Sequence, residues 1–353
     1  MYVTVYKLVF PQGVHVGRYG IGTEGVHVKI PADTLFSALL ATWISLGHDP
    51  DPWVSAFPRA CDGTLTRADP PFLLTSAFPY CKGVLLFPKP SGYELGAGLP
   101  EDLRKKWKKT QFLSEAVLRA MAKGRELAEI IENSTWRGTQ ILLTKDEEKE
   151  LPPEEETIWK EHRIPRVVLD RISSASNLFH VGRVDFAADA GLWFGVIWRD
   201  PDRLCGAHTF NEAFEIALRA LSQSGIGGER TYGYGVFDYE LMDEFAWPDP
   251  EPGKEALLLS RYNPRSDELP DVLRNAYGYQ LEEVRGWTSS PHGQYRRRSI
   301  VMLTEGSVLK SSGDVMGRLV DVSPIHAETK EPLLPHPVWR YGLAALWPLG
   351  GES

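Results

Sequence analysis

The sequence has little cysteine and no long apolar run. Cys61, Cys81 and Cys205 lie far apart, and none of them forms a C-x-x-C pair or a Cys/His pair at zinc spacing. This argues against a disulfide framework and against a structural zinc site. Without a run of 18 apolar residues, no membrane span is expected. The N-terminus alternates like a strand and has no basic segment of a signal peptide, so we expect a cytoplasmic protein.

The sequence also lacks an excess of positive charge. Its formal net charge is −8, which argues against a protein that coats nucleic acid non-specifically but leaves a local RNA site open. No lysine occurs between Lys160 and Lys254. Basic contacts from this region must therefore come from arginine, whose planar guanidinium suits phosphate and base edges.

Glycine, by contrast, is concentrated in one stretch. Residues 225–235 hold five glycines in eleven positions, with Arg230, Thr231, Tyr232 and Tyr234 among them. Glycines allow positive φ angles and the close approach of another backbone. Main-chain N–H groups and an arginine can meet phosphate there, and tyrosines can stack on bases. The alternative is a C-cap and a tight connection without a ligand.

The setting of this loop excludes the commoner phosphate-binding loops. It follows a helix expected over 209–223, with a capping box at Thr209 and Glu212, and precedes a strand over 236–241. A dinucleotide fingerprint has the opposite order and a glycine where this chain has Arg230. No Gly-Lys-Ser/Thr occurs, so a P-loop is excluded as well.

The patterns along the chain predict an α+β fold. With 353 residues and 42% apolar content the chain is long enough for two domains. The order strand (2–10), helix (from 33), strands, helix and strand is that of a ferredoxin-like β-α-β-β-α-β domain, the layout of RNA-recognition modules. We expect this domain over 1–246, with a helical insertion at about 101–160 whose residues 146–156 form a solvated loop. A stiff linker (247–253) and a smaller ferredoxin-like domain (254–353) would follow.

Several segments together resemble a known family. The helix followed by the glycine loop resembles the RAMP superfamily of CRISPR-associated proteins. Further pieces resemble, in order, the type III-A (Csm-type) effector subunit that binds the 5′ tag of the guide RNA (crRNA), the fourth Csm subunit family. They are residues 14–17, 31–39, 86–90, 104–109, 167–171, 305–309 and 336–342. One departure is Pro31-Ala32, where the family pattern has a polar pair.

The resemblance implies a subunit without catalytic residues, cofactor or metal. It would cap one end of an antiviral ribonucleoprotein complex, hold the crRNA 5′ tag, and contact the large polymerase-like palm-domain subunit and the adjacent RAMP backbone subunit. The predicted RNA-binding residues are Gly225, Gly227, Gly228, Arg230, Thr231, Tyr232, Gly233, Tyr234, Gly235, Arg171, His15, Arg18 and Lys29. Asp33 is expected to be a structural helix N-cap.

Two other functions stay open at this point. His15, with His27 or His180, can act as general acid and base of a metal-independent RAMP endoribonuclease that processes guide RNA. The second open function is that of a protein-only scaffold, in which the glycine loop merely turns the chain.

Two basic runs have no assigned role. Residues 104–109 form a solvated face or a contact surface, and Arg296–Arg298 form a phosphate clamp or a salt-bridged edge.

Overall fold

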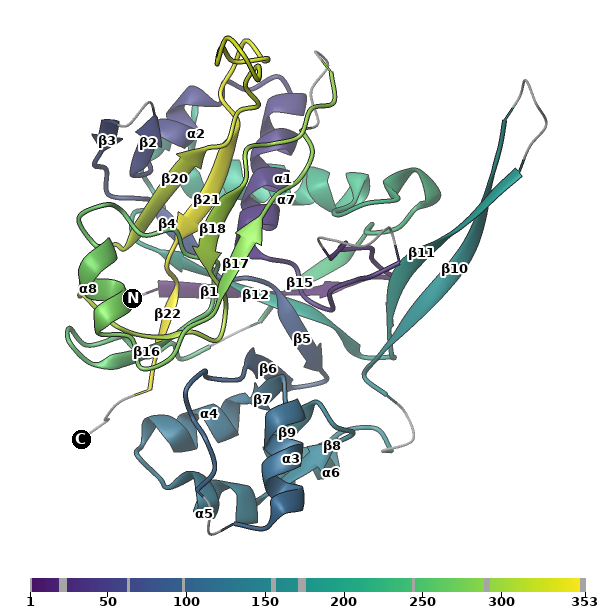
Figure 1. The fold of residues 1–353 in the computed structure, drawn as a ribbon, viewed down its shortest axis with the longest axis vertical. Helices are drawn as coiled ribbons and strands as arrows, with labels where there is room; N and C mark the ends of the chain where they lie inside the picture. The colour runs from purple at the N-terminus through teal and green to yellow at the C-terminus, as the bar shows by residue number, and fades with distance from the viewer. Residues whose placement is uncertain are drawn as a thin grey trace.

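The structure, a computed structural model, has an α+β fold in which strands predominate (Figure 1). It describes residues 2–18, 24–61, 64–96, 99–153, 157–170, 176–242, 245–288 and 293–349.

One antiparallel sheet organises the first part of the chain. Its strands lie in the order β15-β1-β12-β5, and β4 also pairs with β12. Their bounds are β1 (Tyr2–Val9), β4 (Phe72–Leu74), β5 (Phe78–Cys81), β12 (Ala190–Trp198) and β15 (Asp238–Met242). Every residue of β12 is buried. Both faces of the sheet are therefore covered.

Helices cover one face of this sheet, and the C-terminal part of the chain covers the other. Helices α1 (Ala32–Ser45) and α7 (Phe210–Ser224) lie side by side, and α2 (Asp51–Ser55) follows α1 (Figure 1). From α7, Phe214 packs against Phe194 and Trp198 of β12. On the opposite face, Phe87 touches both Trp193 and Trp347. The predicted capping box of α7 is confirmed, with Thr209 and Glu212 bonding each other's backbone N–H.

The N-cap of α1 corrects one prediction. Pro31, in an extended conformation, is the N-cap, and no side chain caps the helix. Asp33 is instead the second helical residue, and its buried carboxylate accepts hydrogen bonds from Arg261 and Arg340. These partners lie more than 200 residues away in the chain. The local pattern therefore could not distinguish this ion-paired carboxylate from a cap.

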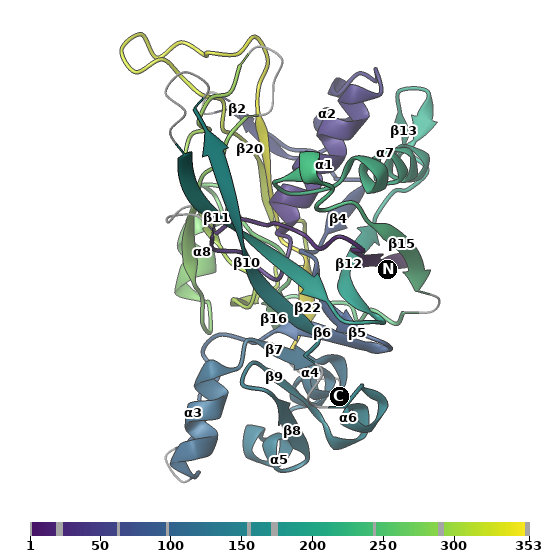
Figure 2. The ribbon, with the colours of Figure 1, turned by 90° about the vertical axis from the view of Figure 1, so that its right-hand side faces the viewer.

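The insertion predicted as helical at about 101–160 contains helices α3 to α6 and, in addition, strands β7 to β9. It extends the sheet beyond β5 in the order β6-β7-β9-β8 and lies at the lower end in Figures 1 and 2. Residues predicted as a solvated loop begin with α6, because Thr144 and Glu147 form a capping box. The elements are β6 (Val84–Pro88), α3 (Glu101–Lys109), β7 (Phe112–Ser114), α4 (Glu115–Ala122), α5 (Leu127–Glu132), β8 (Ser134–Arg137), β9 (Ile141–Thr144) and α6 (Lys145–Glu150).

A long two-stranded arm projects from the body (Figure 1). It consists of β10 (Trp159–Leu169) and β11 (Ser176–Phe186), paired antiparallel from Trp159↔Phe186 to Leu169↔Ser176. Near its base, Val184 bridges Val14 of the segment after β1. The outer part of the arm exposes apolar side chains, including Val167, Val168, Leu169 and Leu178.

The C-terminal strands are divided among three small sheets. These have the orders β19-β16-β22, β17-β18 and β21-β20-β2-β3. The last one includes β2 (Arg59–Cys61) and β3 (Thr64–Thr66) of the N-terminal part. The other elements are β13 (Leu204–Cys205), β14 (His208–Thr209), β16 (Glu255–Leu258), α8 (Leu269–Arg274), β17 (Leu281–Val284), β18 (Ile300–Leu303), β19 (Val308–Lys310), β20 (Gly317–Asp321), β21 (Trp339–Leu343) and β22 (Leu346–Pro348).

The hydrophobic core runs across the boundary predicted at 247–253. One buried cluster joins residues of both parts, among them Leu39, Phe72, Tyr341 and Trp347. Trp247 itself is buried against Trp347, with ring centroids 5.0 Å apart. The division into two ferredoxin-like domains stays a prediction.

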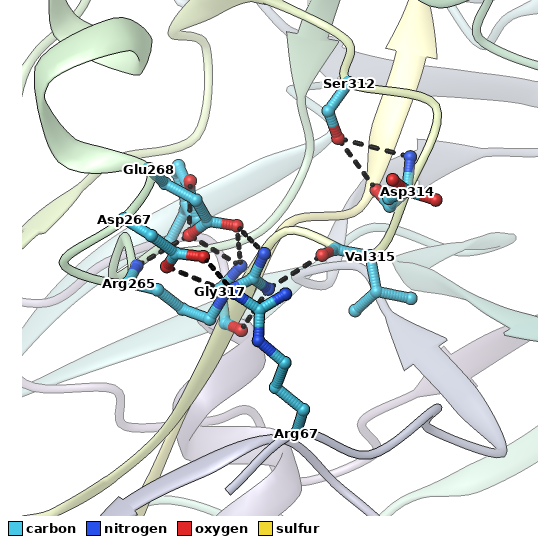
Figure 3. Close-up of polar contacts among 9 residues, drawn as sticks. Arg67, Arg265, Asp267, Glu268, Ser312, Asp314, Val315 and Gly317 are labelled. Atoms are coloured by element: carbon cyan, nitrogen blue, oxygen red, sulfur yellow. Dashed lines mark hydrogen bonds and ion pairs between the residues drawn. The ribbon is translucent and has the colours of Figure 1, made fainter. Parts of the chain in front are cut away.

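A polar cluster also joins the two parts (Figure 3). Arg67, which follows β3, donates to Asp267 over 2.6 Å. The neighbouring carboxylate of Glu268 accepts from the backbone N–H of Arg265 and of Gly317. Asp267, Glu268 and Arg265 also line a cavity of about 250 Å³ beside α8. Because Asp267 and Glu268 already have donors, we interpret this cluster as structural.

Candidate nucleic-acid interface

The glycine loop begins where α7 ends. Gly225 caps the helix at φ 78°, and its N–H donates to the carbonyl of Leu221. A short 3-10 turn, η1 (Arg230–Tyr232), follows between Glu229 and Gly233, both in the left-handed conformation. Ile226 N–H then donates to Gly235 O and closes the loop. The loop is thus a fixed structure rather than an open chain segment.

Two glycines are required because another backbone lies against them. A Cβ at Gly235 would lie 1.9 Å from Ile226 O, and one at Gly227 would lie 2.3 Å from His15 O. The loop is held on the segment after β1 by Gly228 N–H to His15 O and Gly235 N–H to Gly13 O. These two N–H groups are therefore already bonded. Where we expected the loop's N–H groups to hold phosphate, these two bond protein carbonyls instead.

The opposite side of the loop is open. Gly227 through Tyr232 line a hollow of about 500 Å³. Arg230 and Thr231 are exposed, and within the described part of the chain the Arg230 side chain has no hydrogen bond or ion pair. Tyr232 is 59% exposed, whereas Tyr234 is 5% exposed. Arg230, Thr231 and Tyr232 are therefore the side chains that a ligand can reach.

The arm contacts the loop through arginines that sequence reasoning missed. Arg166 of β10 lies 4.0 Å above the ring centroid of Tyr232 and donates to the Tyr234 hydroxyl over 3.2 Å. Arg183 of β11 lies 5.4 Å from the Tyr234 ring. Both arginines lie on the strands of the arm. No local pattern indicates that these strands fold back on a loop more than 40 residues later.

His15 has a structural position. Its side chain is 8% exposed, and Nδ1 lies 2.7 Å from the carbonyl oxygen of Gly182, to which it donates as Nδ1–H. The ring also fills the space beside Gly228, where a Cβ would lie 2.7 Å from its Cδ2. His15 thus joins the segment after β1, the glycine loop and β11, and offers little surface to RNA.

The other predicted contacts have different outcomes. Arg18 is exposed on the edge formed by the bridge Gly17↔Val26. Lys29 is not free, because its ammonium lies 2.6 Å from Glu305 Oε2. Arg171 lies outside the described residues.

Lys29 and His27 lie close to the buried carboxylate of Glu305. Burial alone would raise the pKa of Glu305, but Lys29 and Arg261 bring it down to about 2. Burial together with Lys29 and Arg18 lowers the pKa of His27 to about 4. His27 is therefore neutral near pH 7. Among the described residues, no group of three or more His, Cys, Asp or Glu side chains is placed to hold a metal ion.

Comparisons with known proteins indicate the family to which the chain is related. Residues 251–349 match the family model for the CRISPR Csm4 C-terminal domain. A CRISPR system Cms protein Csm4 from Thermococcus onnurineus is 28% identical over 339 residues, covering 93% of this chain and 94% of that protein. None of the described helices is long and apolar enough to cross a membrane.

Solved structures share the fold. A crystal structure of a Csm3–Csm4 subcomplex of the type III-A CRISPR-Cas interference complex matches with a TM-score of 0.63 and 18% identity, covering 99% of each chain. A Csm1–Csm4 cassette in complex with pppApA matches with a TM-score of 0.51 over 100% of each chain. The sequence and the fold together define a CRISPR-associated protein. Within this class, residues 251–349 match the Csm4 C-terminal domain, and the chain is similar to a Csm4 protein over 93% of its length.

Proposed function

We propose that this chain is a non-catalytic, crRNA-binding subunit of a type III-A CRISPR effector complex, and that its glycine loop holds the 5′ tag. The observation that carries this proposal is the open side of the loop, where Arg230 is exposed without a partner among the described residues, beside the half-exposed ring of Tyr232. A free guanidinium next to an aromatic face suits a phosphate and a neighbouring base.

The fold supports this proposal. The sheet order β15-β1-β12-β5 with helices after β1 and β12 supports a ferredoxin-like N-terminal part, the layout of RNA-recognition modules. The glycine loop comes after β12 and before β15 in the sequence, and in the fold it lies against the segment after β1. A loop fixed in this way presents its side chains in one orientation and loses little entropy on binding.

The partners are proposed from relatives. One solved structure contains Csm4 with Csm3, and another contains Csm4 with Csm1. We propose that this chain contacts the corresponding adjacent backbone subunit and the large palm-domain subunit, in the cytoplasm. The apolar side chains exposed at the end of the arm are available for such a contact. The net charge of −8 suits a partner with a basic surface.

The endoribonuclease alternative has less support. A general base that deprotonates a 2′-hydroxyl must reach the RNA, yet the His15 ring is buried and its Nδ1 is bonded to Gly182. His27, with a pKa of about 4, would not supply a protonated acid near pH 7.

Binding at defined salt tests the proposal. The chain, co-purified with its palm-type partner, is titrated with crRNA that carries its repeat-derived 5′ tag and with the same RNA carrying a scrambled tag. We expect a preference for the tag, intact RNA on a gel, and weaker binding for Arg230→Ala. The matched control is Arg274→Ala, an exposed arginine on α8. Equal binding of both RNAs, or equal affinity of Arg230→Ala and the control, would refute the proposal.

A further inference from the structure

Three consecutive arginines, Arg296 to Arg298, have three different environments. Arg298 donates to the backbone carbonyls of Ser323 and Asp321 over 2.9 and 2.8 Å. Arg296 lies 5.2 Å from the ring centroid of Trp287 on the opposite side of a hairpin, where Trp287 and Arg296 pair antiparallel. Arg297 between them lies near Arg340. Only Arg298 is a salt-bridged edge residue, with Asp321 3.6 Å away.

Arg297 is half-buried and forms no ion pair among the described residues, although the carboxylate of Asp33 acts on it from a longer distance. At Gly286, a Cβ would lie 3.6 Å from Nη2 of Arg340 and 3.9 Å from Cδ of Arg297, so both side chains border this glycine. Arg297 Nε is buried without a hydrogen bond. Its side chain forms no ion pair within the described part of the chain.

The nearby carboxylates are already shared by other arginines. Asp33 accepts from Arg261 and Arg340, and Glu282 accepts from Arg261. With Glu305, which also acts on Arg261, and its partner Lys29 included, four cations face three carboxylates, which leaves one positive charge uncompensated. Burial and the neighbouring Arg340 lower the pKa of Arg297 to about 10, so the group stays charged near pH 7. A buried charge without a partner is costly, and an anion would remove that cost.

The hairpin also offers a stacking surface. Trp287 is 59% exposed, with the guanidinium of Arg296 beside its ring. Exposed indoles and guanidinium planes are the groups on which unpaired bases stack. A carboxylate ligand would explain the unpaired Arg297 but would make no use of Trp287. A nucleotide uses both.

We propose that Arg297 binds a phosphate group of an RNA strand and that Trp287 stacks on the base of a neighbouring nucleotide. This second contact rests on the proposed function, because the strand is the crRNA held at the glycine loop. Its residues come from the C-terminal part, so the RNA would contact both parts of the chain. Arg340 is 3% exposed and already bonds Asp33 and the carbonyl of Arg285, so it offers little surface to the RNA itself.

The anion site is tested without RNA. Thermal unfolding of the full chain is measured in inorganic phosphate and in chloride at equal ionic strength. We expect phosphate to raise the Tm of the wild type and to lose this effect in Arg297→Gln, while Arg274→Gln keeps it. Comparing the two salts within each variant separates the ligand effect from any change in stability. An equal phosphate effect in wild type and Arg297→Gln would overturn the site.

The RNA contact is tested by its salt dependence. For single strands, the slope of log K against log salt falls by about 0.7 for each lost phosphate contact. Arg297→Gln should lower the affinity for tagged crRNA and reduce the slope by about this amount. Trp287→Ala should weaken binding by about 5- to 150-fold, the range for one stacked base, with an unchanged slope. Trp287→Phe should restore most of the affinity.

The outcomes separate this inference from the proposed function. If Arg230→Ala loses the tag while Arg297→Gln keeps both affinity and slope, the inference fails and the proposed function stands. If the wild type does not bind tagged crRNA, both the proposed function and the second RNA contact are refuted. An effect of Arg297→Gln on phosphate but not on RNA would identify a site for free phosphate and overturn the RNA contact.

Discussion

At the scale of single residues, the glycine loop shows why only some of its glycines are needed. Gly233 and Gly235 both have positive φ angles, 82° and 77°. A Cβ at Gly233 meets no atom within 4 Å, whereas one at Gly235 overlaps the carbonyl of Ile226. The sequence does not distinguish the two glycines. The fold shows that Gly233 is required only for its positive φ angle, whereas Gly235 is also required because no Cβ fits there.

We therefore expect Gly235→Ala to destabilise the protein more than Gly233→Ala. A left-handed non-glycine residue costs about 1–2 kcal/mol, and this is the whole cost expected at Gly233. At Gly235 the backbone must also move, which adds to it. Chemical denaturation followed by tryptophan fluorescence measures both free energies of unfolding. Equal losses would show that the close approach of the Ile226 carbonyl adds no cost at Gly235.

His27 gives a pH-dependent prediction at the same scale. Its pKa is lowered from 6.5 to about 4, first by burial and then by Lys29 and Arg18. Between these values the unfolded chain binds the proton more strongly, so stability falls as pH decreases from 6.5 to 4. After allowance for solvent screening of a partly exposed group, we expect His27→Asn to remove about 1–2 kcal/mol of this dependence. Urea unfolding across this pH range tests it, with His326→Asn, on an exposed segment, as the control.

At the scale of elements, sequence patterns predicted where strands and helices lie along the chain better than they predicted which of these elements contact one another. The alternation at 2–10 and the capping box at Thr209 correspond to β1 and α7. Residues 101–132 carry a helical pattern, yet β7 interrupts it, because Phe112 and Leu113 pair with Ile141 and Leu142. The pairing depends on residues nearly 30 positions later, which no local pattern encodes.

The candidate site was only partly predictable for the same reason. Arg230 and Tyr232 could be chosen from the loop's composition, and both are exposed. Lys29 could not be excluded from sequence, because its partner Glu305 lies 276 residues away. Arg166 could not be found, because its contact requires the arm to lie across the loop. The sequence therefore indicates the local chemistry of a segment but not the contacts that it makes with residues far away in the chain.

The contact of the arm with the loop gives a prediction at this scale. Arg166→Ala removes the cation–π contact with Tyr232 and the hydrogen bond to Tyr234, worth about 1–2 kcal/mol together. We expect faster hydrogen exchange at residues 230–235 and weaker binding of tagged crRNA. Arg163→Ala is the control, since Arg163 is exposed on the same strand and pairs with Glu24. Unchanged exchange in Arg166→Ala would show that the arm does not stabilise the loop.

At the scale of the whole molecule, the two parts of the chain share their interior. β2 pairs with β20, Ser76 N–H donates to Leu259 O, and the hydroxyl of Tyr341 accepts from Leu74 N–H. The Pro-rich composition of 247–253 indicated a boundary, but composition reports local stiffness and not which surfaces become buried. Trp247 within that segment lies in the common core. The parts are therefore expected to unfold together.

Asp33 provides the sharpest test of this joint unfolding. Its carboxylate is buried in α1 of the N-terminal part, and its partners Arg261 and Arg340 belong to the C-terminal part. Asp33→Asn keeps the shape but leaves two buried guanidinium groups without their shared anion. Breaking such a buried pair costs about 3–5 kcal/mol. Because the ion pairs join both parts, we expect the loss in one cooperative transition, seen equally by calorimetry and by circular dichroism.

The control for Asp33→Asn is Asp271→Asn, an exposed carboxylate on α8 that should change stability by less than about 0.5 kcal/mol. Two separate transitions in Asp33→Asn, with only one displaced, would show that the parts fold independently and that the shared core contributes little. A single displaced transition would mean that the interface holding Asp33, Arg261 and Arg340 is part of one folding unit. Arg297, which we place at the RNA and which borders Gly286 together with Arg340, would then lie beside the contacts that hold the two parts together.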